Sequence, residues 1–159
     1  EDAGEEGKGT GYIPLFTAPD AHILVVDDHE MNLEVLKGLL RATKINIDTA
    51  SGGEEAVAMA RVKKYDIILL DLRMPVVDGA EALLRIREPG SGPNTDTPVI
   101  CLTADAISGT REKLLAEGFT DYLSKPINGR ELEQVIREYL PEEKIQKNTE
   151  EKIQKNSLQ

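Results

Sequence analysis

Hydrophobic residues follow two alternating patterns between His22 and Leu140. Short, continuous apolar runs occupy 23–26, 67–70 and 99–102, and such runs are typical of strands buried on both faces of a parallel sheet. Segments with apolar residues at helical spacing follow these runs. Strands that alternate with helices in this way pair in parallel through right-handed crossovers. The pattern therefore predicts an α/β domain with one five-stranded sheet and helices on both faces.

Two weaker strands complete the predicted sheet. Residues 45–49 alternate between apolar and polar, which is typical of an edge strand, and 121–124 form a last short strand. The first helix is expected to bury one apolar stripe, which is made of Met31, Val35, Leu36, Leu39 and Leu40.

Two helix starts carry a capping signal. Ser51 is followed three residues later by Glu54, and Asn128 is followed three residues later by Glu131. In such a pair the first side chain accepts a hydrogen bond from the backbone N–H three residues on. Helices are therefore predicted to begin after Ser51 and after Asn128.

The two ends of the chain differ from the predicted domain. Residues 1–20 are rich in Gly and Pro and are predicted to be a linker or leader, apart from a small apolar group around Phe16 that has the character of a packing segment. Residues 142–148 recur as 150–156, and this eight-residue period does not fit a heptad. We therefore predict one domain over 21–140 and a tail over 141–159 that is a helical extension or disordered.

Composition and charge argue against several functions. The 159 residues carry a formal net charge of −10, which disfavours nucleic-acid binding because phosphate neutralisation needs a surplus of Lys and Arg. No apolar run approaches the roughly 20 residues of a membrane helix. The single cysteine allows no internal disulfide, which favours a cytoplasmic location. The chain does not begin with Met, and we expect it to be a piece of a longer protein.

Polar side chains follow four of the predicted strands at the point where each strand ends. Asp27 and Asp28 follow the first strand, Asp71 closes the third, Thr103 closes the fourth, and Lys125 follows the fifth. Open parallel sheets bind ligands at this edge, so these side chains are expected to converge on one pocket. Crowded carboxylates stay ionised beside a cation, and Mg²⁺ prefers such oxygen ligands. The sequence thus predicts a site for Mg²⁺, or for Mn²⁺ in its place.

A phosphoryl group is the natural second ligand of this pocket. Asp71 would be the nucleophile that forms an aspartyl-phosphate. Lys125 and the cation would balance the added charge, while the Thr103 hydroxyl and the Ala104 backbone N–H would donate to phosphate oxygens. Each residue alone has a commoner explanation as a turn, cap or surface residue. Only their joint spacing favours the shared site.

Two other functions also place a reactive acid on a parallel sheet. A phosphatase of the haloacid-dehalogenase type needs a second acid two residues after Asp71, where this chain has Arg73. A flavodoxin-like cofactor module needs Gly and hydroxyl residues in the first loop, where this chain has the acidic run 27–30. Both alternatives are therefore disfavoured.

Four motifs resemble those of the receiver domains of two-component response regulators, in order and spacing from His22 to Leu140. They are Val25-Val26-Asp27-Asp28, Leu70-Asp71-Leu72-Arg73-Met74-Pro75 with Asp78-Gly79, Leu102-Thr103-Ala104, and Asp121-Tyr122-Leu123-Ser124-Lys125-Pro126. The resemblance implies a flavodoxin-like α/β fold of five βα units with strand order 2-1-3-4-5. It also implies a signalling switch whose only enzymatic activity is its own phosphorylation and dephosphorylation.

The resemblance assigns roles in metal and phosphate binding. It implies that Asp71 accepts the phosphoryl group and that Lys125 contacts it. It implies that Asp27, Asp28, Asp71 and the backbone carbonyl of Arg73 hold the metal ion. Each of these assignments is a prediction about the carboxyl edge of the sheet.

The resemblance also assigns roles in switching. Thr103 and Tyr122 are implied to form the coupled switch, in which the hydroxyl moves toward the phosphate and the ring turns inward. Arg73 and Asp105 lie two residues after the phosphoacceptor and the switch hydroxyl, respectively, and are implied to tune the lifetime of the phosphate. The Lys125-Pro126 peptide bond is expected to be cis.

Partners follow from the same resemblance. The implied phosphodonor is a histidine kinase or a histidine phosphotransfer domain, and the parent protein is expected to be a hybrid sensor histidine kinase. The fourth helix, fifth strand and fifth helix form the implied output face and a candidate homodimer surface. This segment is expected to bind neither nucleic acid nor membrane.

Overall fold

A five-stranded parallel sheet is the centre of the computed structural model, which describes residues 12–147. Its strands are β2 (His22–Val26), β3 (Asn46–Ala50), β4 (Ile67–Asp71), β5 (Val99–Thr103) and β6 (Asp121–Ser124). They lie in the order β3-β2-β4-β5-β6. When these five strands are numbered 1 to 5 along the chain, their order in the sheet is 2-1-3-4-5. The predicted flavodoxin-like fold is therefore confirmed.

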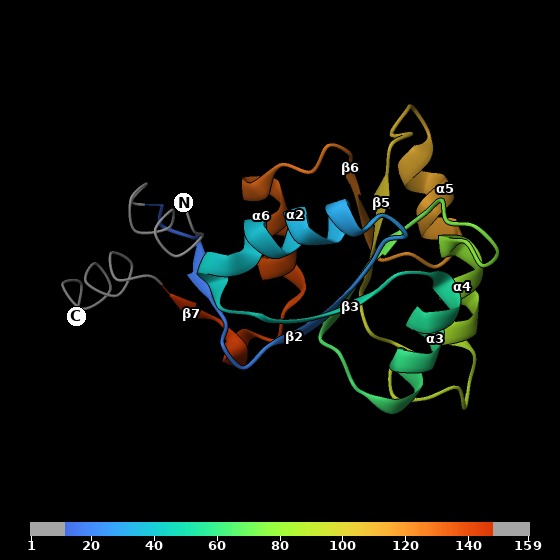
Figure 1. Cartoon of the computed structure of the whole chain (residues 1–159), viewed down its shortest axis with the longest axis horizontal. Helices are drawn as coiled ribbons and strands as arrows, with labels where there is room; N and C mark the ends of the chain where they lie inside the picture. The colour runs from blue at the N-terminus through green and yellow to red at the C-terminus, as the bar shows by residue number, and fades with distance from the viewer. Residues whose placement is uncertain (1–11, 148–159) are drawn as a thin grey trace.

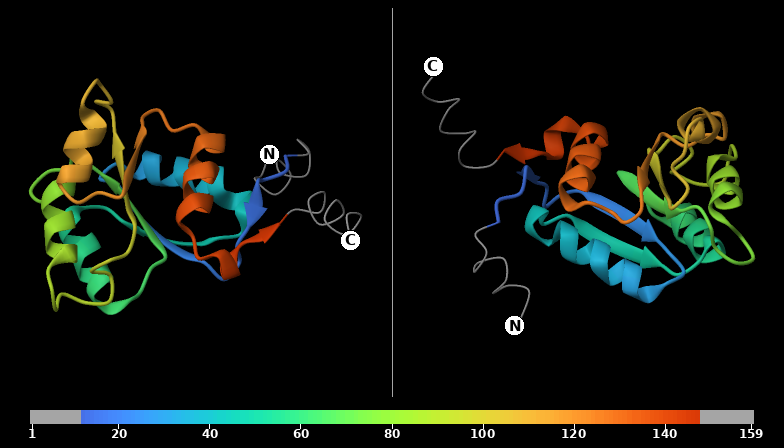
Figure 2. Two further views of the ribbon diagram at one scale, coloured as in Figure 1. Left: turned by 180° about the vertical axis from the view of Figure 1, so that it is seen from behind. Right: turned by 90° about the horizontal axis from the view of Figure 1, so that it is seen from above.

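Five α-helices cover the two faces of the sheet (Figures 1 and 2). They are α2 (Glu30–Leu40), α3 (Gly53–Val62), α4 (Gly79–Arg87), α5 (Thr110–Ala116) and α6 (Gly129–Tyr139). Helices α2 and α6 bury apolar residues in the cluster on one face, and α3, α4 and α5 bury theirs in the cluster on the other. The described part of the chain holds no helix that is long and apolar enough to cross a membrane.

The buried stripe of α2 differs from the predicted one. Leu33, Leu36 and Leu40 are buried, whereas Met31 is 73% exposed and Val35 is 50% exposed. Both sets of residues have helical spacing, and the packing of α6 and the sheet against one side of the helix decides which set is covered. The prediction for Met31 and Val35 is therefore wrong, and α2 presents apolar side chains on its outer side.

The two predicted capping signals behave differently. At α6 the Asn128 side chain accepts a hydrogen bond from the Glu131 backbone N–H at 3.0 Å, as predicted. At α3 the helix begins at Gly53 and its N-cap, Gly52, makes no side-chain bond. Ser51 instead donates through its backbone N–H and its hydroxyl to Glu55, both at 2.9 Å. The predicted Ser51–Glu54 capping pair is therefore wrong, and Ser51 bonds to Glu55 outside the N-cap position.

A segment that precedes the five-stranded sheet in the sequence pairs with one that follows it, and the two form a small antiparallel sheet. Strand β1 (Phe16–Thr17) pairs with β7 (Gln146–Lys147), which follows the 3₁₀ turn η2 (Glu142–Lys144). We call residues 12–18 and 142–147 together the clasp. Figure 1 shows β1 and β7 side by side at one end of the molecule.

The clasp is anchored in the body of the domain. Phe16 is 0% exposed and lies in the same apolar cluster as the buried faces of α2 and α6. On α6, the fully buried carboxylate of Glu133 accepts hydrogen bonds from the Tyr12 hydroxyl at 2.5 Å and from the Leu15 backbone N–H at 2.9 Å. Lys144 forms an ion pair with Asp66 at 3.0 Å. Residues 12–18 therefore pack on the domain, as the apolar group around Phe16 indicated, although the composition of residues 1–20 as a whole predicts a linker.

The predicted tail shows a different form where it is described. Residues 142–147 make a 3₁₀ turn and a short strand rather than a helical extension. The remaining tail residues and the leader before residue 12 lie outside the described residues, and the predictions for them stay predictions.

Candidate phosphoryl and metal site

Polar side chains gather at the carboxyl edge of the sheet because strands β2, β4, β5 and β6 all run toward it. Asp27 and Asp28 follow β2, Asp71 is the last residue of β4, and Thr103 is the last residue of β5. Lys125 follows β6 directly, and its peptide bond to Pro126 is cis as expected. Parallel pairing brings these strand ends together, which is the geometry that the sequence predicted.

Asp71 and Lys125 form the contact at the centre of the site. The Lys125 Nζ donates to Asp71 Oδ1 at 3.0 Å and to Asp27 Oδ2 at 3.4 Å. Asp71 is only 4% exposed and Asp27 is fully buried. One ammonium group therefore bridges two buried carboxylates from different strands.

Burial is the largest influence on the pKa values of both Asp71 and Lys125. Burial raises the pKa of the Asp71 carboxyl above its ordinary value, the hydrogen bond from Lys125 opposes this shift, and the negative charges of Asp27 and Asp28 add to it. Burial lowers the pKa of Lys125, but its hydrogen bond to Asp71 and the nearby carboxylate charges outweigh burial and raise it overall. The site thus holds more negative charge than its single lysine neutralises.

Asp27 and Asp28 differ in how they are held. Asp27 accepts hydrogen bonds from the His29 backbone N–H at 2.9 Å and from the Asn32 side chain at 3.1 Å. Asp28 is partly exposed, but its Oδ1 is buried and has no hydrogen-bond partner among the described residues. A buried carboxylate oxygen without a donor is costly, and a divalent cation satisfies such an oxygen. The donor set therefore fits Mg²⁺.

Thr103 and Tyr122 lie on neighbouring strands. Thr103 is 3% exposed and pairs with Ser124 in the sheet, two residues beyond the pair of Cys101 with Tyr122. The Thr103 hydroxyl oxygen accepts a hydrogen bond from the Asp105 backbone N–H at 3.0 Å. Its own O–H remains able to donate to a ligand. Tyr122 is half-buried against the apolar cluster of α3, α4 and α5.

Arg73 and Asp105 form an ion pair at the mouth of the site. The guanidinium of Arg73 donates to Asp105 Oδ2 through Nε at 3.1 Å and also through Nη2. Both side chains are more than half exposed, so solvent screens the pair and its contribution to stability is small. Arg73 occupies the position where a haloacid-dehalogenase phosphatase needs an acid, which argues against that chemistry.

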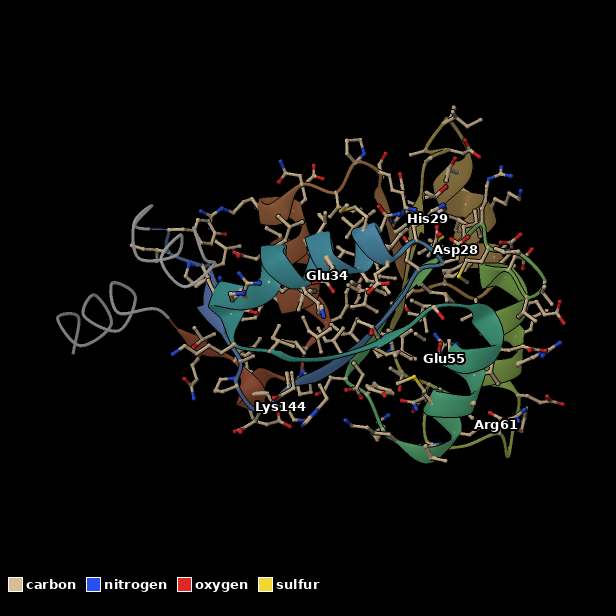
Figure 3. All side chains as sticks on the ribbon, viewed as in Figure 1. Asp28, His29, Glu34, Glu55, Arg61 and Lys144 are labelled. Atoms are coloured by element: carbon tan, nitrogen blue, oxygen red, sulfur yellow. The ribbon has the colours of Figure 1, made fainter. Side chains whose placement is uncertain are left out.

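Two residues near the acids were not predicted as part of the site. Asn32, one turn into α2, holds Asp27 through its amide. His29 is exposed over most of its side chain, but its Nδ1 lies 3.3 Å from Asp28 Oδ1 and 3.6 Å from Asp27 Oδ1 (Figure 3). His29 and Asn32 are three residues apart at the start of α2, and this spacing, which favours side chains on the same side of a helix, is the signal in the sequence that could have grouped them.

The fold and the acidic edge define the class: a parallel α/β domain whose ionisable groups meet at the carboxyl ends of its strands. The chain belongs to the response regulator receiver domain family, whose model matches residues 23–137. It is therefore a receiver domain of two-component signalling, as its four motifs predicted.

Individual relatives support this membership. The chain is 36% identical over 119 residues to the signal transduction histidine-protein kinase BarA of Escherichia coli, and the match covers 75% of this chain and 13% of BarA. It resembles the receiver domain of sensor histidine kinase PA1611 from Pseudomonas aeruginosa, solved with a magnesium ion in the active site cleft, at 35% identity and a TM-score of 0.65; 75% of this chain and 96% of that one are covered.

A third relative was solved with a partner. The chain resembles a structure of the Saccharomyces cerevisiae histidine phosphotransfer protein Ypd1 in complex with the Ssk1 receiver domain, at 30% identity and a TM-score of 0.66, covering 77% of this chain and 90% of that one. The chain spans only a small part of the curated kinases that it matches, 4% and 13% of the first two.

Proposed function

We propose that this receiver accepts a phosphoryl group on Asp71 from a phosphohistidine donor. The observation that carries the proposal is the Lys125 ammonium, 3.0 Å from Asp71 and 3.4 Å from Asp27 at the edge where the strands end. A carboxylate oxygen of Asp71 attacks phosphorus and forms the new O–P bond. The N–P bond of the donor breaks, and its electron pair returns to the imidazole nitrogen, which takes up a proton.

The residues present fit a divalent cation, and we place it with Asp27, Asp28, Asp71 and the backbone carbonyl of Arg73. Support comes from the unpartnered buried oxygen of Asp28 and from the excess negative charge around Asp71. When bound, Mg²⁺ or Mn²⁺ would neutralise charge on the transferring phosphoryl group. Lys125 holds Asp71 Oδ1 by a hydrogen bond, and its ammonium also compensates negative charge of the carboxylates and of the phosphoryl group.

A switching step follows from the hydrogen bonds of Thr103. Its hydroxyl oxygen holds the Asp105 backbone N–H, and Asp105 is in turn held by Arg73. When the Thr103 hydroxyl donates to a phosphate oxygen, it would pull this loop toward the site and open space into which the Tyr122 ring turns. Changes in the Tyr122 ring resonances on phosphorylation would report the step.

The central experiment maps the phosphoryl group. Treating the protein with acetyl phosphate and Mg²⁺, followed by borohydride reduction and peptide mass spectrometry, should place the acyl phosphate on Asp71. The Asp71→Asn variant should incorporate none, because the amide is not a nucleophile. Asp96→Asn is the matched control, since Asp96 is 89% exposed and distant from the described strand ends. Labelling of Asp71→Asn equal to that of the parent would overturn the proposal.

The same phosphorylated sample tests two further proposals. Its decay after donor removal measures the lifetime that Arg73 and Asp105 are proposed to set. Its mass by light scattering, with and without phosphate, tests a homodimer through α5, β6 and α6. Within one chain, the three elements of that face are connected through Asp121 on β6, which accepts hydrogen bonds from Arg111 of α5 at 3.4 Å and from Tyr139 of α6 at 2.8 Å.

An apolar hollow beside the site supports a protein as phosphodonor. It has a volume of about 500 Å³. Its apolar lining is Val35, Leu36, Leu102, Pro126 and Ile127, and it reaches the site at Asp27, Asn32 and Lys125. The exposed side chains of Met31 and Val35 extend this surface along α2. A partner helix that docks here lies next to Asp71. We propose that the donor is a histidine phosphotransfer domain or histidine kinase, and that the parent protein is a hybrid histidine kinase.

A charge in this hollow should separate protein donors from small ones. Val35→Glu is expected to slow phosphoryl transfer from phosphorylated Ypd1 by at least about tenfold, or about 1.4 kcal/mol, because it places a carboxylate in an apolar interface. Phosphorylation by acetyl phosphate should be unchanged. Val62→Glu is the matched control, since Val62 is 84% exposed on α3, against the other face of the sheet. Equal rates for both variants with Ypd1 would contradict docking at this hollow.

A further inference from the structure

His29 is held with its ring nitrogen toward the acidic pair. It is the N-cap residue of α2, and its backbone N–H donates to Asp27 at 2.9 Å, which fixes the residue against that carboxylate. Its Nδ1 then lies 3.3 Å from Asp28 Oδ1 and 3.6 Å from Asp27 Oδ1. The rest of the ring reaches into solvent, since the side chain is 72% exposed. Figure 3 shows Asp28 and His29 adjacent at the start of α2.

The nitrogen and two carboxylates form a compact donor group. Asp27, Asp28 and His29 each offer one ligand atom, and the three atoms lie within 4.8 Å of one another. A second observation points to a cation there: the nearest of these atoms to the nitrogen, Asp28 Oδ1, is the buried oxygen that lacks a hydrogen-bond partner among the described residues. The imidazole therefore lies beside the oxygen that most needs a positive ligand.

We propose that His29 adds a nitrogen ligand to the divalent-cation site and shifts its preference from Mg²⁺ toward Mn²⁺ and Co²⁺. Mg²⁺ is a hard ion that favours oxygen donors, whereas imidazole binds the first-row transition ions increasingly well along their series. The inference rests on the proposed function, because it concerns the same cation site. It goes further by naming a residue of this chain that sets which cation occupies that site.

Calorimetry at one fixed pH tests the preference. MgCl₂, MnCl₂ and CoCl₂ are titrated into the full chain, into His29→Asn and into His22→Asn. His29→Asn is expected to weaken Mn²⁺ and Co²⁺ binding by at least about tenfold while leaving Mg²⁺ binding within about threefold. His22→Asn is the matched control because His22, the only other histidine of the chain, begins β2 at the opposite edge of the sheet. It should behave as the parent does.

Electron spin echo spectroscopy of bound Mn²⁺ gives a direct readout of the ligand. The parent and His22→Asn should show nitrogen modulation from a coordinated imidazole, and His29→Asn should lack it. Absence of this modulation in the parent, or an equal loss of affinity for all three cations in His29→Asn, overturns the inference. In either case the phosphoacceptor site still stands, whereas failure of the parent to bind any of the cations would remove the proposed function as well.

Discussion

Replacing Lys125 with methionine is expected to slow phosphorylation of Asp71 by about 100-fold, the usual cost of removing one charge-stabilising donor. The same change should lower the free energy of unfolding of the metal-free protein by about 3 kcal/mol. Both effects have one cause. Lys125 bridges Asp71 and Asp27 at 3.0 and 3.4 Å, and its removal leaves two buried carboxylates without their common cation.

The stability difference between the parent and Lys125→Met should depend on pH. Because the pKa of Asp71 is raised in the folded state, the folded state binds the Asp71 proton more tightly than the unfolded state. The contribution of Asp71 to stability is therefore largest at acidic pH and is lost as pH rises through the raised pKa. Without Lys125, the hydrogen bond that opposes this shift is gone, so the pKa of Asp71 rises further. The stability gap between parent and Lys125→Met should therefore widen from about pH 4.5 to about pH 7.5.

Urea denaturation in EDTA at those two pH values, and again with saturating Mg²⁺, measures the effect. Mg²⁺ should restore part of the loss, since it supplies charge to the same carboxylates. Lys37→Met is the matched control, because Lys37 pairs with Glu34 on the surface of α2, at 3.0 Å; it should change stability by less than about 1 kcal/mol. A pH-independent loss in Lys125→Met would show that the lysine acts through packing rather than charge.

The carboxyl edge of the sheet was predictable because Asp27, Asp71 and Thr103 each directly follow an apolar run. A buried strand such as 67–70 has a clear signature in sequence, and the residue after it must emerge at the edge where the strands end. The position of Asp71 therefore follows from local sequence. Its contact with Lys125, 54 residues away, follows only once parallel pairing is accepted.

The faces of α2 and the surroundings of the acids were less predictable. Helical spacing fits Met31 and Val35 as well as Leu33 and Leu36, so periodicity alone leaves open which set faces the sheet. The orientation of His29 likewise depends on the backbone bend between β2 and α2. Such choices are made by tertiary packing, which a single sequence does not display.

Apart from the apolar group around Phe16, the clasp had almost no signal in the sequence. Two-residue strands show no periodicity, and β1 pairs with β7 across most of the chain length. Glu133 lies on α6 with 0% exposure, whereas a glutamate is ordinarily expected at the surface. The Tyr12 hydroxyl and the Leu15 backbone N–H donate to the buried carboxylate, and Arg130 lies 3.6 Å from it on the same helix. The composition of residues 1–20 therefore pointed to a linker.

Phe16→Ala should show whether this segment belongs to the folded unit. The Phe16 ring is fully buried against the cluster of α2 and α6, and its removal is expected to cost about 3–5 kcal/mol of unfolding free energy. That is a large fraction of the roughly 5–15 kcal/mol that stabilises a typical domain. A flexible linker would instead tolerate the change with almost no loss.

Denaturant titration of the full chain measures this loss. Ile13→Ala is the matched control within the same segment, since Ile13 is 53% exposed, and it should change stability by less than about 0.5 kcal/mol. Under native conditions Phe16→Ala should still accept phosphate on Asp71, because the clasp lies at the other end of the molecule from Asp28 and His29, as the position of Lys144 in Figure 3 shows. A loss below about 1 kcal/mol would return residues 12–18 to the status of a linker. The expected loss would place the start of the folded unit before Phe16, outside the span 23–137 that the receiver family model matches.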